Sequence, residues 1–536
     1  MKDADMSTAT NPLTCRAMVT SPSVAASEAG AQILRDGGTA IEAVVATASV
    51  LAVTYPHFCG IGGDAVWMVA DQTGKVSSFL GIGQAALGAT SDINTPIPLR
   101  GPASTLTTAC TVDSWQHALD HSARHWGGTR KLGDLIEPAI ALAENGFPVS
   151  PSQCFWLNFR KDDYQDWPGF ADIFAPNGRA PKAGEIFVQP QLAESLKLIA
   201  KNGARDFYEG ELARKIAKGL ADAGSPIRAR DLELTRTRTA DAVSLEYGDI
   251  TLYAPPAPTQ GLATLMTMGI LREMGTKDWG ESNADHFHLV VEAIKRAFLE
   301  RDRIGDPNDT DADADFGNML ALETLRKNAT DIAMDRAMEW PHLFRHGDTV
   351  FLAATDAQGN CASVLQSTYF DWGSGVVAGD TGIVWQNRGA AFSTAEGHPN
   401  QLKPGKRPFY TLNPGLALRN GKPCLLYGTQ GADGQPQTLA MLLTRMIDFN
   451  LSPAEALARP RFLLGKTFSD SRDSLKLEAD AEPAVFVELV KRGHILREIE
   501  PQSALAGQAG IIRIAPDGSV DGAHDSRSDG AAIGIT

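Results

Sequence analysis

The 536-residue sequence has few cysteines and no excess of positive charge. Its six cysteines are scattered, and no two of them form a CxxC pair or another pattern of metal ligands. We therefore expect reduced thiols, as in a cytoplasmic protein. The formal net charge of −15 disfavours nucleic acid and anionic membranes as partners, but says little about a small-molecule substrate.

No stretch is apolar for long enough to cross a membrane. The most apolar run, 43–53, contains Thr47 and Ser49 and is too short to span a bilayer. The first ten residues lack the apolar segment of a signal peptide, so we predict none and expect a cytoplasmic location. The hydrophobic content of 43% is typical of a globular protein, and the length predicts more than one lobe.

Two segments resemble ligand-binding loops, but each lacks part of its motif. The glycine-rich segment 60–64 has neither the lysine of a P-loop nor the full dinucleotide spacing, so we interpret it as a tight structural turn. The acidic segment 306–316 lacks the glycine and the terminal glutamate of an EF-hand, which favours a solvated loop over a calcium site. We predict neither a metal nor a cofactor.

Local patterns predict the positions of two helices. Thr39, followed by Glu42, is typical of a capping box that opens a helix. The spacing of apolar residues in 288–303 predicts an amphipathic helix. On that helix we expect Glu292 and Arg296 to form an ordinary surface pair.

Two β-rich runs on either side of a short glycine-containing loop predict a hairpin. We expect Asp356 to pair with Cys361 across that loop. Thr349 then faces Thr368, with Ser367 beside it, so hydroxyl groups meet at the open end of the hairpin. A strand favours threonine for reasons of shape alone, so this pattern does not by itself make Thr349 catalytic.

A family resemblance gives this threonine a role. Asp348 and Thr349, the hairpin that they begin, and the segments 372–377 and 380–383 resemble the γ-glutamyltransferase family of N-terminal-nucleophile hydrolases. The resemblance covers about 19–534. It implies an α+β fold, the four-layer αββα sandwich, in which two antiparallel sheets lie between layers of helices.

The resemblance also implies self-cleavage between Asp348 and Thr349. A disordered leader (1–17) would precede a large subunit (18–348), and a small subunit (349–536) would follow the cut. The two subunits would share one core, and processed heterodimers could form a homo-oligomer. The freed α-amino group of Thr349, with an ordinary pKa of about 7.7–8.0, would activate the Thr349 hydroxyl to form an acyl-enzyme with a substrate amide.

Other catalytic positions also follow from the resemblance. Ser367 matches the family's second threonine, which polarises the nucleophile. Gly431 and Ala432 match a glycine pair whose backbone N–H groups hold the oxyanion. They lie in a glycine-rich turn before a predicted helix, where free N–H groups gather. Ala432 needs a backbone φ angle compatible with that role.

Substrate recognition is where the sequence departs from the family. Ile82 stands where the family has an arginine that grips the glutamyl carboxylate. Arg388, Ala391 and Tyr369 stand where it has a glutamine, an aspartate and an asparagine. Losing the aspartate removes the counter-charge for a substrate ammonium group. Gaining Arg388 favours an anion close to the scissile amide, unless Arg388 forms a surface or structural ion pair.

These departures favour a small acyl group. Tyr410 and Thr411 match paired serines that contact the substrate carboxylate, and Tyr410 narrows the space. We therefore favour hydrolysis of a short carboxylated amide, as in the oxamate-amidohydrolase-like branch of the family. The alternatives are a γ-glutamyl hydrolase or transferase acting on glutathione-type substrates, a glutaryl or cephalosporin-type acylase, and an unprocessed, catalytically silent homologue.

Overall fold

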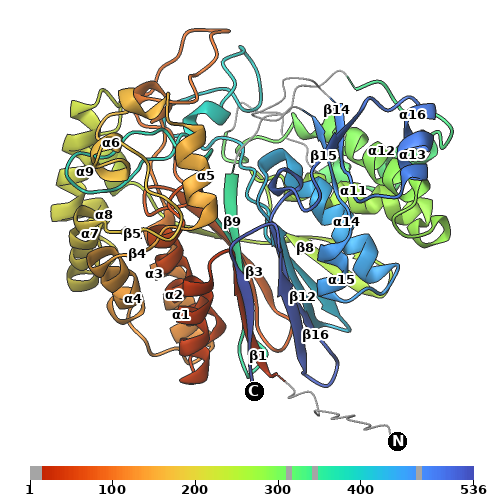
Figure 1. Ribbon diagram of the computed structural model, residues 1–536, viewed down its shortest axis with the longest axis horizontal. Coiled ribbons are helices and arrows are strands. Elements are labelled where there is room, and N and C mark those ends of the chain that lie inside the picture. The colour runs from red at the N-terminus through yellow and green to blue at the C-terminus, as the bar shows by residue number, and fades with distance from the viewer. Residues whose placement is uncertain (1–14, 310–316, 341–347, 466–473) are drawn as a thin grey trace, which may run out of the picture.

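A computed structural model describes residues 15–309, 317–340, 348–465 and 474–536. Two antiparallel sheets lie face to face in the middle of the molecule, and helices cover the outer face of each (Figure 1). This is the predicted αββα sandwich. Within the described residues, no helix combines the length and apolarity that a membrane span needs.

The first sheet has seven strands in the order β18-β1-β9-β10-β2-β3-β6, and every neighbouring pair is antiparallel. Along that order the strands span Ala531–Ile535, Ala17–Ser21, Asp348–Thr355, Cys361–Tyr369, Asp64–Ala70, Val76–Gly81 and Arg238–Ala240. Strand β9, which begins at Asp348, is buried along its whole length because β1 and β10 flank it.

The second sheet has six antiparallel strands in the order β17-β16-β12-β11-β8-β7. They span Val520–His524, Ala509–Ile514, Lys422–Thr429, Gly415–Arg419, Ile250–Ala254 and Val243–Tyr247. Side chains alternate between the two faces of a strand, so each sheet directs every second residue inward. Phe351 and Leu365 of the first sheet thus share a buried core with Leu416 and Leu426 of the second.

Helices of the first half of the chain cover the first sheet, and the others cover the second (Figure 1). The first group is α1 (Val24–Arg35), α2 (Ala40–Thr54), α3 (Thr111–His125), α4 (Leu132–Asn145), α5 (Pro151–Phe159), α6 (Phe170–Phe174), α7 (Pro190–Asn202), α8 (Asp206–Glu209), α9 (Glu211–Asp222) and α10 (Ala229–Glu233). The second group is α11 (Gly261–Met274), α12 (Ala284–Arg301), α13 (Leu322–Thr330), α14 (Gln435–Ile447), α15 (Pro453–Ala458) and α16 (Pro483–Lys491).

Two small sheets complete the fold. One consists of β13 (Phe462–Gly465), β14 (Ser474–Glu478) and β15 (Leu496–Ile499), and the other of β4 (Phe147–Pro148) and β5 (Ile186–Phe187). Residues 310–316, most of the acidic loop, and 341–347, just before the expected cut, lie outside the described residues. The boundaries of the leader and of the two subunits therefore stay predictions, although β1 already begins at Ala17.

The predicted capping box is confirmed at the start of α2. The Glu42 backbone N–H donates to Thr39 Oγ1 at 3.2 Å, and the Thr39 N–H donates to the Glu42 carboxylate at 2.8 Å. Every residue of α2 is buried, because the helix lies between the first sheet and the outer helices. A helix enclosed on all sides is apolar all round, which explains the long apolar run in this segment.

The hairpin between β9 and β10 forms, but its predicted register is wrong by one residue. Thr355, not Asp356, pairs with Cys361. The Asp356 backbone N–H instead donates to the Asn360 carbonyl at 3.0 Å. The Asp356 carboxylate also accepts the N–H groups of Gln358 and Asn360, so this side chain closes the turn and cannot lie in the strand pairing.

The register shifts again at a β-bulge near the end of β10. Tyr369 pairs with Asp348 there and adopts a left-handed φ of +86°. A bulge places two residues of one strand against one of its partner. Between the pairs Val350–Gln366 and Asp348–Tyr369, Thr349 lies opposite both Ser367 and Thr368, as predicted, and its hydroxyl bonds that of Ser367.

The glycine-rich segment 60–64 forms the predicted turn, in which the Gly63 N–H donates to the Gly60 carbonyl. A Cβ atom at Gly63 would lie 2.2 Å from the backbone carbonyl oxygen of Ser367. A Cβ atom at Gly60 would have its nearest neighbour, a methyl carbon of Thr368, at 3.9 Å. Glycine at 63 thus allows the turn to pass directly against the end of β10.

We predict that Gly63→Ala lowers the free energy of unfolding by roughly 1–3 kcal/mol, because the added methyl group must push backbone away from backbone. Thermal unfolding followed by circular dichroism measures the effect. Gly60→Ala is the matched control in the same turn and should unfold like the wild type. Equal stability of the two variants would contradict the close approach described above.

Candidate active site

The hydroxyl groups of Thr349 and Ser367 lie in one hydrogen-bonded chain at the start of β9. Thr349 Oγ1 donates to Ser367 Oγ at 3.2 Å, and Ser367 Oγ donates to the carbonyl oxygen of Asp348 at 2.6 Å. The Tyr369 N–H donates to Ser367 Oγ at 2.8 Å. Ser367 therefore polarises the carbonyl group of the Asp348–Thr349 peptide bond, and the bulge holds it in that position.

The Asp348 side chain is buried beside a charge cluster that the sequence did not indicate. Arg160 binds both carboxylate oxygens of Asp371, at 2.6 and 2.8 Å, and Arg100 binds one of them at 2.8 Å. Burial, followed by the charge of Asp371, raises the pKa of Asp348 well above its usual range, against the opposing effect of the two arginines. Three of these four side chains come from distant segments, so no local pattern could reveal them.

Arg388 is fully buried in the short 3₁₀ helix η5 (Arg388–Ala391) and lies between two tyrosine rings. Its guanidinium carbon is 3.8 Å from the Tyr369 ring centroid and 4.6 Å from that of Tyr410. Nη1 donates to Thr411 Oγ1 at 3.2 Å. The four residues predicted to bind substrate are thus brought together.

Two nitrogens of the Arg388 guanidinium, Nε and Nη2, have no hydrogen-bond partner among the described residues. Within the same residues Arg388 forms no ion pair either, and it is not exposed, so the alternative of a surface or structural ion pair does not fit. A buried cation with free donors is unfavourable unless an anion completes it. The arrangement suits a small carboxylate held against two flat aromatic walls.

Asp64, which the sequence analysis did not single out, holds Tyr410 beside Arg388. Its carboxylate accepts the Tyr410 hydroxyl at 2.8 Å and the backbone N–H groups of Gly83 and Cys110 at 3.0 and 2.9 Å. Burial raises the pKa of Asp64 to about 6, although the Tyr410 hydrogen bond and the Arg388 charge lower it. Its position after the glycine turn was the only available signal.

The two positions where the family's charges are missing are apolar in the structure. Ile82 is fully buried in the core between the sheets, in contact with the cluster that includes Tyr410. Ala391 ends η5 and packs with Tyr369. Neither position offers a charge to the α-carboxylate or the ammonium group of a glutamyl substrate.

The predicted oxyanion loop joins β12 to α14 through the 3₁₀ turn η6 (Ala432–Gly434). Gly431 has a φ of +119° and Ala432 a φ of +44°, so the alanine adopts the left-handed conformation at a cost of about 1–2 kcal/mol. Gln260 donates from Nε2 to the carbonyl oxygens of Ala432 and Thr411, at 2.8 and 2.6 Å. This glutamine, also missed in the sequence, fixes the loop relative to the Arg388 group.

A cavity of about 660 Å³ opens beside Asp348 and Gly431. Its other lining residues include Phe58 and aromatic residues of α5, together with polar residues from the C-terminal part of the chain. Arg388 does not line it. The predicted oxyanion loop and the expected scissile bond therefore lie at the wall of this cavity.

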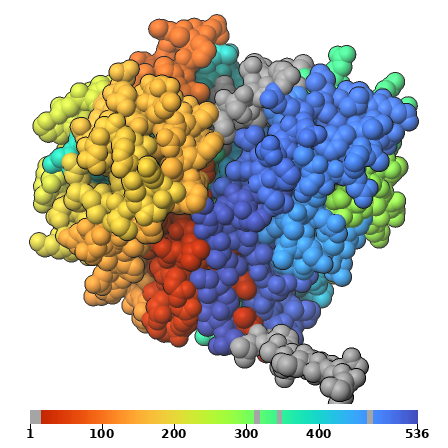
Figure 2. Space-filling model, in the orientation of Figure 1, coloured from red at the N-terminus to blue at the C-terminus, as the bar shows by residue number. Residues whose placement is uncertain are grey.

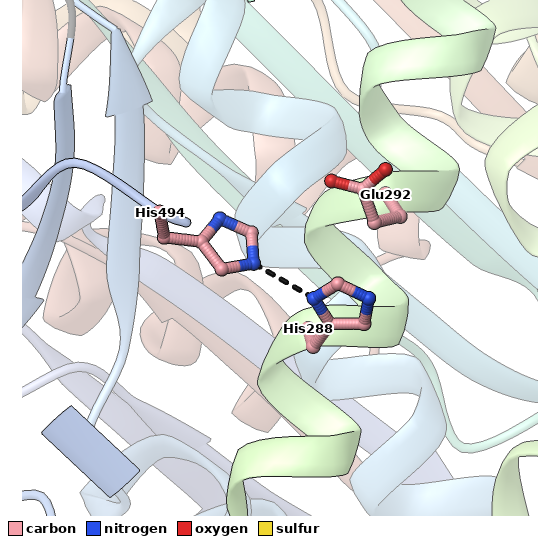
Figure 3. A group of neighbouring side chains, drawn as sticks. All are labelled: His288, Glu292 and His494. Atoms are coloured by element: carbon pink, nitrogen blue, oxygen red, sulfur yellow. Dashed lines mark hydrogen bonds between the residues drawn. The ribbon is translucent and has the colours of Figure 1, made fainter. Parts of the chain in front are cut away.

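A second group of titratable residues lies away from this site. His288 and Glu292 project from α12 toward His494, which follows α16 (Figure 3). The His288 and His494 rings share a hydrogen bond of 2.8 Å, and His288 Nε2 is 2.9 Å from the carbonyl oxygen of Ala333. Burial lowers the pKa of both imidazoles, that of His494 to about 3, so both rings are neutral at pH 7.

The charges around Glu292 argue against a metal ion at that group. Lys295 and Arg296 bind its carboxylate at 2.8 and 2.9 Å, and the Met338 N–H donates to it at 3.1 Å. All three charged side chains are buried, so the prediction of a surface pair between Glu292 and Arg296 is wrong. Two cations already neutralise this carboxylate, and the group instead anchors the segment around Met338 that leads to Asp348.

Comparison with known proteins supports the predicted family. The family model for gamma-glutamyltranspeptidase matches residues 26–535. The chain belongs to this family. It is accordingly an N-terminal-nucleophile amidohydrolase. The predicted family and fold are thereby confirmed.

Among curated members of the family, the oxamate amidohydrolase proenzyme of Klebsiella pneumoniae subsp. pneumoniae is 41% identical over 96% of this chain and 98% of its own length. The glutathione hydrolase-like YwrD proenzyme of Bacillus subtilis is 39% identical over 97% of this chain and 98% of its own. The crystal structure of cephalosporin acylase from Bacillus halodurans superposes with a TM-score of 0.88 at 30% identity, covering 98% of this chain and 96% of the other.

We predict that Ser367→Ala slows cleavage of the chain about 10²- to 10³-fold, the usual effect of losing one donor to a developing oxyanion. Denaturing gel electrophoresis of freshly purified protein over time gives the rate. Ser363→Ala is the matched control, because Ser363 is a buried serine of the same strand whose hydroxyl has only a 3.5 Å contact with the Tyr427 carbonyl. Cleavage of both variants at the wild-type rate would show that Ser367 does not polarise the Asp348 carbonyl.

Proposed function

We propose that the chain cuts itself between Asp348 and Thr349 and then uses Thr349 as its N-terminal nucleophile. The short bond from Ser367 to the Asp348 carbonyl supports the cut, and so do relatives that are proenzymes. The Thr349 hydroxyl attacks this carbonyl, the peptide C–N bond breaks, and an ester forms at Thr349 Oγ1. Water hydrolyses the ester and leaves Thr349 with a free α-amino group.

In the processed enzyme, that α-amino group accepts the proton of the Thr349 hydroxyl as the oxygen attacks the substrate amide. The N–H groups of Gly431 and Ala432 would stabilise the oxyanion of the tetrahedral intermediate. The amide C–N bond then breaks, and the leaving amine takes the proton. Water attacks the resulting acyl-enzyme, releases a carboxylate and restores Thr349. An uncleaved chain lacks this base and should be inactive as an amidase.

The substrate that we propose is a short carboxylated amide of the oxamate type. The observation that carries this proposal is Arg388, buried between Tyr369 and Tyr410 with two guanidinium nitrogens that have no hydrogen-bond partner among the described residues. Such a guanidinium can hold a carboxylate through paired hydrogen bonds. The similarity to an oxamate amidohydrolase, at 41% identity, agrees with it.

The alternatives fit the site less well. A γ-glutamyl substrate carries an ammonium group, and Ala391 supplies no counter-charge for it. A silent homologue would have no need of the ordered bonds between Thr349, Ser367 and the scissile carbonyl. The cytoplasmic location and assembly into oligomers stay predictions.

We predict that the processed enzyme releases ammonia from oxamate and does not cleave γ-glutamyl-p-nitroanilide. Arg388→Met should lower kcat/KM for oxamate roughly 10- to 150-fold, the effect of losing a charge-assisted contact of about 1.5–3 kcal/mol. Arg388→Lys keeps the positive charge but loses the paired guanidinium donors, so its activity should lie between those of the wild type and Arg388→Met. Preferential cleavage of the γ-glutamyl compound would instead support the glutathione-type alternative, and Arg388→Met with full oxamate activity would exclude the proposed role.

We also predict that KM for oxamate falls as the pH is lowered through 6. Above its pKa of about 6, Asp64 carries a negative charge that partly neutralises Arg388, and below it the carboxyl is protonated. When Asp64 is protonated, the positive charge of Arg388 therefore attracts the substrate anion more strongly. Asp64→Asn, which preserves the acceptor for Gly83 and Cys110, should make KM independent of pH in this range. Steady-state kinetics between pH 5 and 8 measures KM. If KM of Asp64→Asn depended on pH as that of the wild type does, this explanation would be contradicted.

A further inference from the structure

A second cavity lies at the edge of the central sheets where β6 leads into β7. These two strands end one edge of their sheets, and the C-terminal strands β18 and β17 form the opposite edges. The dark-blue C-terminal part of the chain lies beside the red N-terminal segment in the middle of the face shown in Figure 2. The second cavity has a volume of about 520 Å³ and shares no lining residue with the cavity beside Asp348. This volume suffices for a small organic ligand.

Much of the lining of this second cavity is apolar and comes from both sheets. Leu80 belongs to β3 of the first sheet, and Val243 begins β7 of the second. The apolar lining residues are Leu80, Val243, Pro256, Ala257, Leu262 and Leu320. An apolar group of a ligand that binds against them leaves water, which favours binding.

Arg238 of β6 adds a positive charge to this lining. It pairs with Leu80 of β3, so the two side chains lie on the same face of the first sheet. The guanidinium nitrogens Nε and Nη2 of Arg238 are buried and have no hydrogen-bond partner among the described residues. These two nitrogens share one edge of the planar guanidinium, so their N–H groups point in the same direction and together fit one carboxylate. Buried donors without an acceptor are unfavourable, and a bound anion would satisfy them.

A second arginine adds to the positive charge at this place. Burial, followed by the positive charge of Arg407, lowers the pKa of Arg238, which shows that the two guanidinium groups act on each other. Nε of Arg407 is also buried without a partner in the part of the chain that the structure describes. Because the two cations repel each other, an anion bound beside them would relieve an unfavourable interaction.

Two carboxylates lie in the same region, but neither bonds the two buried nitrogens of Arg238. The charge of Asp306 acts on Arg238 from a distance. The oxygens of Asp306 instead accept the backbone N–H groups of Arg407 and Asn308, each at 3.1 Å, and Nδ2 of Asn308 at 3.0 Å. Asp241 lines the cavity and is exposed, so water and salt screen its charge. Both carboxylates therefore leave the paired donors of Arg238 available to a ligand.

We propose that this second cavity binds an organic anion that carries a carboxylate group on an apolar body. Nε and Nη2 of Arg238 hold the two carboxylate oxygens, and the charge of Arg407 strengthens the attraction. The apolar body lies against the leucine and proline side chains of the lining. Thr349 and Arg388 are not among the lining residues, so this site is distinct from the proposed active site and does not depend on the proposed function.

Isothermal titration calorimetry of the full-length protein with octanoate tests this proposal, and 1-octanol serves as the uncharged probe of the same length. We expect octanoate to bind, and Arg238→Met to weaken its binding roughly 10- to 100-fold, as the loss of a charge-assisted hydrogen bond does. 1-Octanol should bind the wild type more weakly than octanoate, and Arg238→Met should not weaken its binding further. Arg236→Met is the matched control, because Arg236 pairs with Glu209 at the surface and its loss should leave the affinity for octanoate unchanged.

Two further variants locate the bound octanoate. Val243→Trp fills the apolar part of the cavity without removing a charge, so it should also weaken octanoate binding. Arg388→Met should bind octanoate as the wild type does. Binding that Arg388→Met abolishes and Arg238→Met preserves would place the anion at the proposed substrate site and overturn this inference. A wild-type protein that does not bind octanoate would overturn it as well.

Discussion

The position of one hydroxyl group, that of Ser367, is the constraint on which the site depends. It touches the Thr349 hydroxyl on one side and the Asp348 carbonyl on the other, so it links the expected nucleophile to the bond that this nucleophile is expected to attack. The β-bulge turns Ser367 toward β9, and Gly63 allows the neighbouring turn to approach its backbone. The β-bulge and the close turn at Gly63 are less favourable backbone conformations than a regular strand, and they create the geometry of the site.

Charge distribution divides the site into two parts with different tasks. Near Asp348, Arg100 and Arg160 both bind the Asp371 carboxylate, so these charges are already paired with each other and suit a structural role in the uncut chain. Around Arg388, the carboxyl group whose charge acts on the guanidinium is that of Asp64, whose pKa is raised to about 6, and two guanidinium nitrogens have no partner among the described residues. The unbalanced part is where an anionic ligand gains most from binding.

Local signals were sufficient for some elements and not for others. The capping box at Thr39 was predictable because both partners lie three residues apart, and the hairpin was predictable from two β-rich runs. Its register next to the turn was wrong by one residue because the Asp356 side chain closes the turn, and the bulge restores the predicted pairing between Asp348 and Tyr369. The burial of Glu292 was missed because its partner segment around Met338 comes from tertiary packing, which periodicity does not report.

The candidate site shows the same division. The predictions of Thr349, Ser367 and the residues that surround Arg388 rest on the family resemblance, since each matches a position in the family. Asp64 and Gln260 were not predictable, because their roles are defined by partners more than a hundred residues away in sequence. Resemblance transfers positions that the family shares, whereas supporting contacts have to be read from the folded chain.

The fold also explains how a chain cut before Thr349 can stay together. The first sheet places β9 between β10, which follows the cut, and β1, which precedes it. The second sheet likewise pairs β11 with β8 across the same division. Cleavage would leave the pairings of the rest of β9 intact and separate only Asp348, which pairs with Tyr369, from the strand, and the α12 group would still hold the segment around Met338.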